Sequence, residues 1–570
     1  MRTISQRSAV LVSLLLTWGC SSGSSSGSGG APGTAGTAAS GGTHTGGNPG
    51  TSGTPGTGGT PGTGGAPGTG GIPGTGGAQT GGSPNTGGGA AGVPNTGGGA
   101  GGAGGAPISG AGSGGMNSGG GGSSGVTVKL DATHQTIQGF GLNDALLSST
   151  WSAQVLDNLF TTKGSDGIGL SVLRIGMNSS GSLAGTTQSN LDGAKSRGAK
   201  IIGSCWTPPA SCKSNNSEKD GGHVLSSCYG TWSDTISAFA KKYGLYGMSI
   251  GNEPDFASCG SAEPCNGNYE TTVYTANEMV AFIKVAGPKL QANGIKVIAP
   301  EASEWVHLWS NESATGSVPG NKNSSDTLKC GFPASNAACT KGDGYDYGHW
   351  LAKDADAWKA LDILGVHEYD SQHAEKWPSD VTVARKEVWQ TEMSGVKWWP
   401  EQGTLTGSNL TASGTIENGV AVAGWIHSAL VDGEASAWLW WWYEPYNTDD
   451  NEGLLLNKSG GSTKRYYTLG NYSKFVRPGY VMVEVAGNSN TSVLLSAFKG
   501  TDGTVIVAVN KGTAAANVPI SFSGGTAPAS CTPNVTSGTA NLVAGTAVPV
   551  TGGSLMAALA ATSVTTFVCK

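Results

Sequence analysis

The chain has 570 residues, of which 97 are glycine, and carries 32 Lys and Arg against 38 Asp and Glu. Arg2 and Arg7 are the only charged residues among the first 125, so the remaining 445 residues hold 30 basic and 38 acidic side chains. This acidic balance argues against nucleic acid or an anionic lipid surface as the main partner. A folded region of this length favours a large domain accompanied by a small one.

Residues 1–20 have the pattern of an export signal. Arg2 and Arg7 come before an apolar run (9–16), and this run is too short to span a bilayer as a permanent helix. Cys20 follows Gly19 as in a bacterial lipoprotein cleavage site, although the two preceding residues depart from that pattern. Lipidation of Cys20 and ordinary cleavage with release both stay open. We expect an exported protein that is either extracellular or lipid-anchored at the bacterial cell surface.

The next segment, residues 21–125, contains no Asp, Glu, Lys or Arg and consists of Gly-, Thr-, Pro- and Ser-rich repeats. Such a composition cannot bury enough apolar surface to offset the entropy of ordering, so we expect a disordered linker. A flexible linker of this length suits a tether between an anchor and a bulky substrate.

Eight short strand-like runs separated by helix-like stretches follow between residues 138 and 477. Helical spacing of apolar residues begins after Ser152, a candidate N-cap, and another helical stretch ends before Gly294. Strands that alternate with helices indicate a parallel sheet, and eight such units indicate a (β/α)8 barrel (TIM barrel), an α/β fold. The expected strands are 138–141, 170–177, 200–206, 247–253, 295–301, 362–369, 386–392 and 435–442.

The carboxyl ends of these strands carry most of the polar and aromatic residues that could do chemistry. In a barrel they meet on one face, where active sites of this fold lie. Two of them are glutamates: Glu253 in SIGNEPD and Glu392 in VWQTEMSG. Glycosidic-bond cleavage commonly uses such a pair, one carboxylic acid to protonate the leaving oxygen and one carboxylate to attack the sugar. A run of aromatic residues (438–443) could stack on sugar rings.

After residue 477 the helical signal ends, and β-branched or alternating runs separated by Gly-rich turns predict a β-sandwich over 478–570. The run VTVKL, within 126–137, is too isolated to form its own unit and is expected to join that sandwich. The predicted fold is therefore a barrel with a side-docked β-sandwich built from both ends of the catalytic region.

Nine cysteines follow Cys20, and eight of them form couples close in sequence, as expected for disulfides in an oxidising compartment. Their spacings fit no zinc pattern. Cys205, within an apolar strand, is left over and is expected to be free and buried. The predicted pairs are Cys212–Cys228, Cys259–Cys265, Cys330–Cys339 and Cys531–Cys569.

The segments QTIQGFG, CWTPPASCKSN, GNEPD, VWQTEMSG and KRYYTLGNYSKFVRPGY together resemble glycoside hydrolase family 30. This resemblance covers roughly residues 126–490 and extends more loosely to the end of the chain. It implies a (β/α)8 barrel with a side-docked β-sandwich and a retaining mechanism. Xylanases, glucosylceramidases, β-1,6-glucanases and β-1,6-galactanases belong to this family.

By its motifs, the resemblance implies that Glu253 is the general acid/base and Glu392 the nucleophile. Asn252 would then hydrogen-bond the 2-hydroxyl of the sugar. Glu301 and Glu304 are expected to shape the pocket or support structure. The residues expected to shape the pocket, bind substrate or orient the nucleophile are Arg174, Trp206, His367, Tyr369, Trp440 and Trp442.

The expected function is a retaining endo-β-glycanase, first an endo-1,4-β-xylanase, with β-1,6-glucanase or β-1,6-galactanase as alternatives. Four carboxylates after the last strand, in YEPYNTDDNEG (443–453), would repel a uronate and favour a neutral chain. A catalytically silent, surface-held carbohydrate-binding lipoprotein stays open as a different class, while an adhesin leaves the strand-end residues unexplained. We expect a monomer that binds a polysaccharide, with no metal and no cofactor.

Overall fold

The computed structural model of the protein describes residues 125–219, 221–256, 270–310, 344–369, 374–394, 414–444, 453–455 and 462–570. Several predictions concern residues outside these ranges and stay predictions: the export signal, the linker, Cys259–Cys265, Cys330–Cys339, and the acidic residues Asp449, Asp450 and Glu452. No helix in the described ranges is long and apolar enough to cross a membrane.

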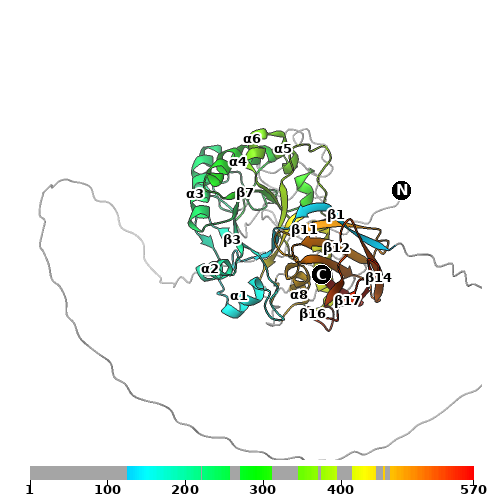
Figure 1. The fold of residues 1–570 in the computed structure, drawn as a ribbon. Coiled ribbons are helices and arrows are strands. Elements are labelled where there is room, and N and C mark those ends of the chain that lie inside the picture. The colour runs from blue at the N-terminus through cyan, green and yellow to red at the C-terminus, as the bar shows by residue number, and fades with distance from the viewer. Residues whose placement is uncertain are drawn as a thin grey trace, which may run out of the picture. The chain divides into compact units, whose positions relative to one another are not determined.

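Eight parallel strands within the described residues close into a barrel, which confirms the predicted fold (Figure 1). The barrel closes because β2 pairs with β10 on one side and with β3 on the other. A short strand, β4 (Leu183–Ala184), adds antiparallel to β3. The barrel strands are β2 (Gly139–Asn143), β3 (Val172–Met177), β5 (Lys200–Cys205), β6 (Gly247–Ser249), β7 (Lys296–Ala302), β8 (Ile363–His367), β9 (Glu387–Glu392) and β10 (Ala435–Trp442).

Helices connect most of these strands and begin at side-chain caps. Ser152 accepts a hydrogen bond from the backbone of Val155, as predicted for the first helix, and Thr275 and Glu278 form a capping box. The helices are α1 (Ala153–Phe160), α2 (Gln188–Ser196), α3 (Tyr229–Lys242), α4 (Ala276–Gln291), α5 (Tyr347–Lys353), α6 (Ala355–Ala360), α7 (Ile416–Val431) and α8 (Lys464–Ser473). Three 3-10 turns add to them: η1 (Ala210–Cys212), η2 (Ser226–Cys228) and η3 (Trp305–Leu308).

The inside of the barrel is filled by a layer of apolar side chains from six strands. Val172, Ile202 and Ile298 pack there against Trp389, which is fully buried. Arg174 lies two residues beyond Val172 and therefore points to the same side of β3. This apolar layer lies next to the polar side chains that gather at the carboxyl end of the barrel, and it supports them.

The remaining strands form a curled mixed sheet beside the barrel, which confirms the predicted side-docked β-sandwich domain. The segment 126–137 joins it as predicted, because β1 (Val126–Thr136) pairs antiparallel with β11 and parallel with β14. The other strands are β11 (Val481–Ala486), β12 (Val493–Gly500), β13 (Gly503–Asn510), β14 (Ala516–Ser523), β15 (Ser530–Thr536), β16 (Val543–Ala544), β17 (Val548–Pro549), β18 (Ser554–Leu559) and β19 (Ser563–Cys569). Its enclosed face buries a second apolar core.

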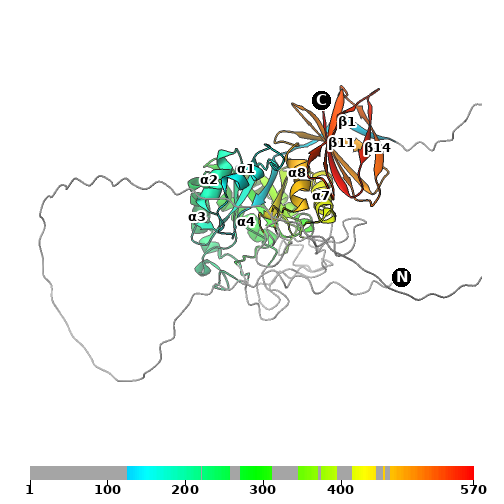
Figure 2. The same cartoon turned by 90° about the horizontal axis from the view of Figure 1, so that it is seen from below.

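Helix α8 and the residues after it join the barrel to the curled sheet. The side-chain amide of Asn471 donates to the carbonyl of Asn534 and to the hydroxyl of Thr566, both at 3.0 Å. Figure 2 shows α7 and α8 on the side of the barrel that faces the sheet. The segment KRYYTLGNYSKFVRPGY is thus a structural connection between the two parts.

Two predicted disulfides are present, Cys212–Cys228 and Cys531–Cys569, and Cys205 is free and buried as predicted. Non-reducing peptide mapping of the whole protein should therefore find Cys205 as a free thiol. It should also find Cys259 linked to Cys265 and Cys330 linked to Cys339. A bridge that includes Cys205 would contradict this scheme.

Candidate active site

The two glutamates singled out in the sequence meet at the carboxyl end of the barrel. Glu392 is the last residue of β9, and Glu253 lies four residues beyond the end of β6. Glu253 has a φ of 46° and Glu301, within β7, a φ of 59°. Non-glycine residues adopt this left-handed region at a cost, and such residues concentrate at functional sites. The backbone N–H of Glu253 donates to the carbonyl of Glu301 at 2.9 Å, which joins the two strained positions.

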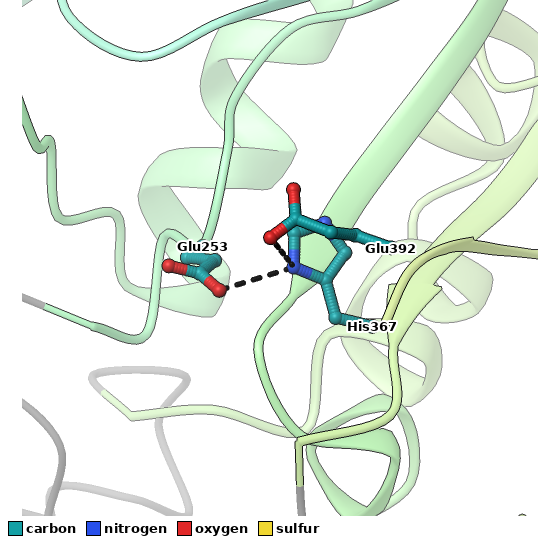
Figure 3. Close-up of side chains that lie close together, drawn as sticks. All are labelled: Glu253, His367 and Glu392. Atoms are coloured by element: carbon teal, nitrogen blue, oxygen red, sulfur yellow. Dashed lines mark hydrogen bonds and ion pairs between the residues drawn. The ribbon is translucent and has the colours of Figure 1, made fainter. Parts of the chain in front are cut away.

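His367, the last residue of β8, lies between the two carboxylates (Figure 3). Its Nδ1 is 3.1 Å from Glu253 Oε1 and 3.8 Å from Glu392 Oε1. One carboxylate oxygen of Glu253 lies within 4.8 Å of one of Glu392. Burial lowers the pKa of His367, although the carboxylate of Glu392 opposes that shift. A neutral imidazole with its proton on Nδ1 can donate a hydrogen bond to Glu253.

Arg174 is completely buried and holds three acceptors of the site at once. Its Nη1 donates to Glu392 Oε2 at 2.7 Å and its Nη2 to Asn252 Oδ1 at 2.5 Å. Its Nε and Nη2 also form a two-point contact with the carboxylate of Glu301, at 3.1 and 2.8 Å. A guanidinium is suited to binding three acceptors at once, because its N–H donors have a fixed planar geometry.

Glu301 is a fully buried counter-charge within this network. Ser204 donates to its Oε2 at 2.6 Å. Burial opposes its charge, but Arg174 more than compensates, so the pKa of Glu301 lies below its ordinary value. A carboxylate held ionised and out of solvent is a poor proton donor, which agrees with the structural role expected for it.

Glu392 receives a second donor from Tyr369, whose hydroxyl lies 3.0 Å from Oε1. The same hydroxyl is 3.4 Å from the hydroxyl of Ser394. Burial raises the pKa of Glu392 above its ordinary value, and the positive charge of Arg174 reduces that rise. Arg174 and Tyr369 thus orient the Glu392 carboxylate from two sides.

Comparisons with known proteins agree with the fold, although no family model matches the chain. A curated relative named glucuronoxylanase XynC, from Bacillus subtilis, is 28% identical over 459 residues, which cover 78% of this chain and 91% of the relative. The structure of a glycoside hydrolase family 30 subfamily 8 xylanase, Xyn30A from Clostridium acetobutylicum, superposes with a TM-score of 0.60. It is 25% identical and covers 78% of this chain and 99% of its own. A family 30 endoxylanase from Clostridium papyrosolvens gives a TM-score of 0.58 at 28% identity and covers 78% of this chain and all of its own.

In sequence and in fold, the chain is similar to xylanases of glycoside hydrolase family 30. It is therefore a glycosidase, and the sequence resemblance is confirmed.

The tryptophans at the end of β10 do not all face the same way. Strict alternation along β10 would place Trp440 and Trp442 on one face, and Trp441 on the other face with Ala437 and Leu439. The register between β10 and β2 is irregular between Trp440 and Trp442, which is the pattern of a bulge. As a result Trp441 and Trp442 stack on each other at 4.8 Å, and Trp441 lies 6.3 Å from Trp206, measured between ring centroids.

Trp440 was predicted to bind substrate, and the structure places it elsewhere. It is fully buried under α8, where the guanidinium of Arg465 lies 5.2 Å from its ring. Trp206, by contrast, covers Arg174, with 5.1 Å between the guanidinium carbon and the ring centroid. Trp441, which the sequence analysis named only within the aromatic run 438–443, shares a face of β10 with Ala437 and Leu439, which line the barrel interior. Alternation alone does not tell which face of a strand points inward, and that is why the sequence did not single out Trp441.

The atoms of Glu253, His367 and Glu392 that face one another are also close enough to hold a metal ion. Arg174 already places a positive charge 2.7 Å from Glu392, so a cation at this point would meet repulsion. The donor set therefore fits carboxylate chemistry better than metal chemistry.

Proposed function

We propose that the chain is a retaining endo-1,4-β-xylanase in which Glu392 attacks the anomeric carbon and Glu253 protonates the leaving oxygen. The observation that carries the proposal is the separation of the two carboxylates, whose oxygens approach within 4.8 Å. Retaining glycosidases hold their carboxyl groups about 5–5.5 Å apart, whereas inverting enzymes need about 6.5–9.5 Å to admit a water molecule. The family 30 relatives named as xylanases supply the substrate class.

The surroundings of each glutamate favour this division of roles. A nucleophile must be ionised and aimed, and Glu392 accepts hydrogen bonds from Arg174 and Tyr369. Glu253 lies 3.1 Å from Nδ1 of His367, and burial favours the neutral form of that ring by lowering its pKa. In the first step Glu392 bonds to the anomeric carbon, the glycosidic bond breaks, and the proton of Glu253 moves to the leaving oxygen. Water then releases the sugar while Glu253 takes a proton back.

Other residues of the site would bind the sugar. Asn252 uses its side-chain oxygen to accept from Arg174, which leaves its amide nitrogen to donate to a 2-hydroxyl. Trp206 and Trp441 would offer faces on which sugar rings stack.

The test of this function is to incubate the whole protein with neutral and uronate-bearing β-glycans and to size the products. A xylanase releases xylo-oligosaccharides of intermediate length with retained β-configuration. Cleavage of only β-1,6-linked glucan or galactan would move the assignment to those activities. Binding without cleavage would identify a carbohydrate-binding protein on the same scaffold.

A pH profile checks the electrostatics of the nucleophile. Catalysis needs Glu392 ionised, so kcat/KM falls as the pH drops through its pKa. Because burial raises that pKa, the acidic limb of the profile should lie above the ordinary glutamate value of about 4.3. An acidic limb at or below that value would contradict the burial argument.

A second prediction concerns the charge beyond β10. Burial raises the pKa of Asp144 well above its ordinary value, and the charge of Glu444 adds to that rise. Asp144 directly follows β2 and Glu444 lies two residues beyond β10, which pairs with β2. We expect uronate-bearing xylan to be a poorer substrate than the same polymer stripped of uronates, by about 1 kcal/mol for each unscreened contact. Changing Glu444, Asp449, Asp450 and Glu452 to their amides should raise activity on glucuronoxylan and leave neutral xylan nearly unchanged. Asp502→Asn, in the turn between β12 and β13, is the control for Glu444→Gln, and a strong preference of the unmodified protein for glucuronoxylan would refute the prediction.

We also propose that residues 1–20 export the protein and that Cys20 carries a lipid anchor, with 21–125 as the tether. The basic start, the short apolar run and Gly19-Cys20 support this. Mass spectrometry of the mature N-terminus decides it, since an unmodified terminus other than Cys20 excludes the anchor.

A further inference from the structure

A second buried polar cluster lies directly behind Glu253 and has no part in the mechanism above. Its centre is Asp255, two residues after the proposed acid and completely buried. Asp255 accepts from the backbone N–H of Ser303 at 2.8 Å and from its hydroxyl at 3.0 Å. His307 Nδ1 lies 2.5 Å from Asp255 Oδ2.

The partners of Asp255 come from the next strand of the barrel. Ser303 directly follows β7, and His307 belongs to η3, where its ring stacks on Tyr345 with 4.0 Å between centroids. The carbonyl of Ser303 accepts from the backbone N–H of Tyr369 at 3.1 Å. Since the hydroxyl of Tyr369 donates to Glu392, a continuous chain of hydrogen bonds runs from the loop of the acid to the nucleophile.

The charge of Asp255 makes these contacts strong. Burial alone would raise the pKa of Asp255, but the hydrogen bond and charge of His307, together with the donors of Ser303, hold it below its ordinary value. A buried carboxylate is stable only when donors surround it, and a fully satisfied group of this kind is rigid. Glu253 needs a rigid support, because its left-handed backbone persists only where the surroundings enforce it.

We propose that Asp255 and His307 are positioning residues that hold Glu253 at the leaving oxygen of the substrate. They touch no substrate themselves. The inference rests on the proposed role of Glu253 as the acid, and it adds the reason why that side chain stays at the distance from Glu392 that retention requires. Misplacement of a reacting group by about 1 Å can cost about 100-fold in rate.

The test compares two substrates that differ in their need for an acid. Xylan has a sugar leaving group that must be protonated, whereas 2,4-dinitrophenyl β-xylobioside has a leaving group that departs without a proton. In the whole protein, Asp255→Asn should lower kcat/KM on xylan by about 10–100-fold and on the dinitrophenyl substrate by less than about threefold. A purely structural defect lowers the active fraction and so reduces both values by the same factor.

Three further variants complete the experiment. Ser303→Ala removes only one hydroxyl donor and should show a smaller selective loss, which provides the result if Asp255→Asn does not fold. Asp346→Asn removes a carboxylate that likewise binds a histidine Nδ1 at 2.5 Å, that of His349, and should show no selective loss. Glu253→Gln should show the largest selective loss. If Glu253→Gln loses both substrates equally, the proposed acid is wrong; if it is selective while Asp255→Asn and Ser303→Ala are not, the positioning role alone is refuted.

Discussion

Replacing Glu392 by Ala should lower xylan hydrolysis by at least about 10⁴-fold, equivalent to roughly 5.4 kcal/mol of transition-state stabilisation. The substitution removes the atom that bonds to the anomeric carbon and leaves a space on that face of the sugar. Azide is small enough to enter that space, and with an activated aryl xyloside it should restore turnover. The product should be a glycosyl azide of inverted configuration, because one displacement then replaces two.

The matched control is Glu253→Ala, in which the nucleophile is intact. Azide should then attack the covalent intermediate, so that the glycosyl azide keeps the β-configuration. Nuclear magnetic resonance of the anomeric proton distinguishes the two products. Appreciable hydrolysis by pure Glu392→Ala protein would remove Glu392 from the nucleophile role, and a β-azide from that variant would exchange the two roles.

Arg174→Met should destabilise the protein by about 3–5 kcal/mol, because it leaves the fully buried carboxylate of Glu301 without its cation. Activity should also fall, since Glu392 and Asn252 lose the donor that orients them. Adding Glu301→Gln should recover much of the stability by removing the buried charge, but little of the activity. Urea unfolding and kcat/KM on xylan measure the two effects separately.

Lys129→Met is the control for this pair of variants. Lys129 binds Glu484 at 2.7 Å, but both side chains are about two-fifths exposed, so its loss should cost at most about 1 kcal/mol. If Arg174→Met costs no more than Lys129→Met, the buried network does not stabilise the fold as argued. If Arg174→Met/Glu301→Gln recovers activity together with stability, Arg174 acts through folding alone.

The sequence determined the barrel because each of its elements is specified by neighbouring residues. Apolar runs of strand length, the cap at Ser152 and the stop near Gly294 are local signals, and the structure has an element at each of them. Parallel strands then bring their carboxyl ends to one face whatever their separation in the chain. That geometric rule is why Glu253 and Glu392, 139 residues apart, could be placed together from the sequence. Cysteines close in sequence could be paired for the same reason of proximity, as Cys212–Cys228 shows.

Tertiary structure alone decided how the strand-end side chains are partnered and which way they face. The fork of Arg174 that joins Glu301, Glu392 and Asn252 depends on four different strand ends, and no spacing in the chain encodes it. Closure of the barrel decides that the face of β10 with Ala437, Leu439 and Trp441 points inward, and the bulge then brings Trp442 beside Trp441. Likewise, the support of Glu253 by Asp255 and His307 arises from contact between neighbouring loops. Such contacts depend on distances between elements, which are fixed only when the barrel closes.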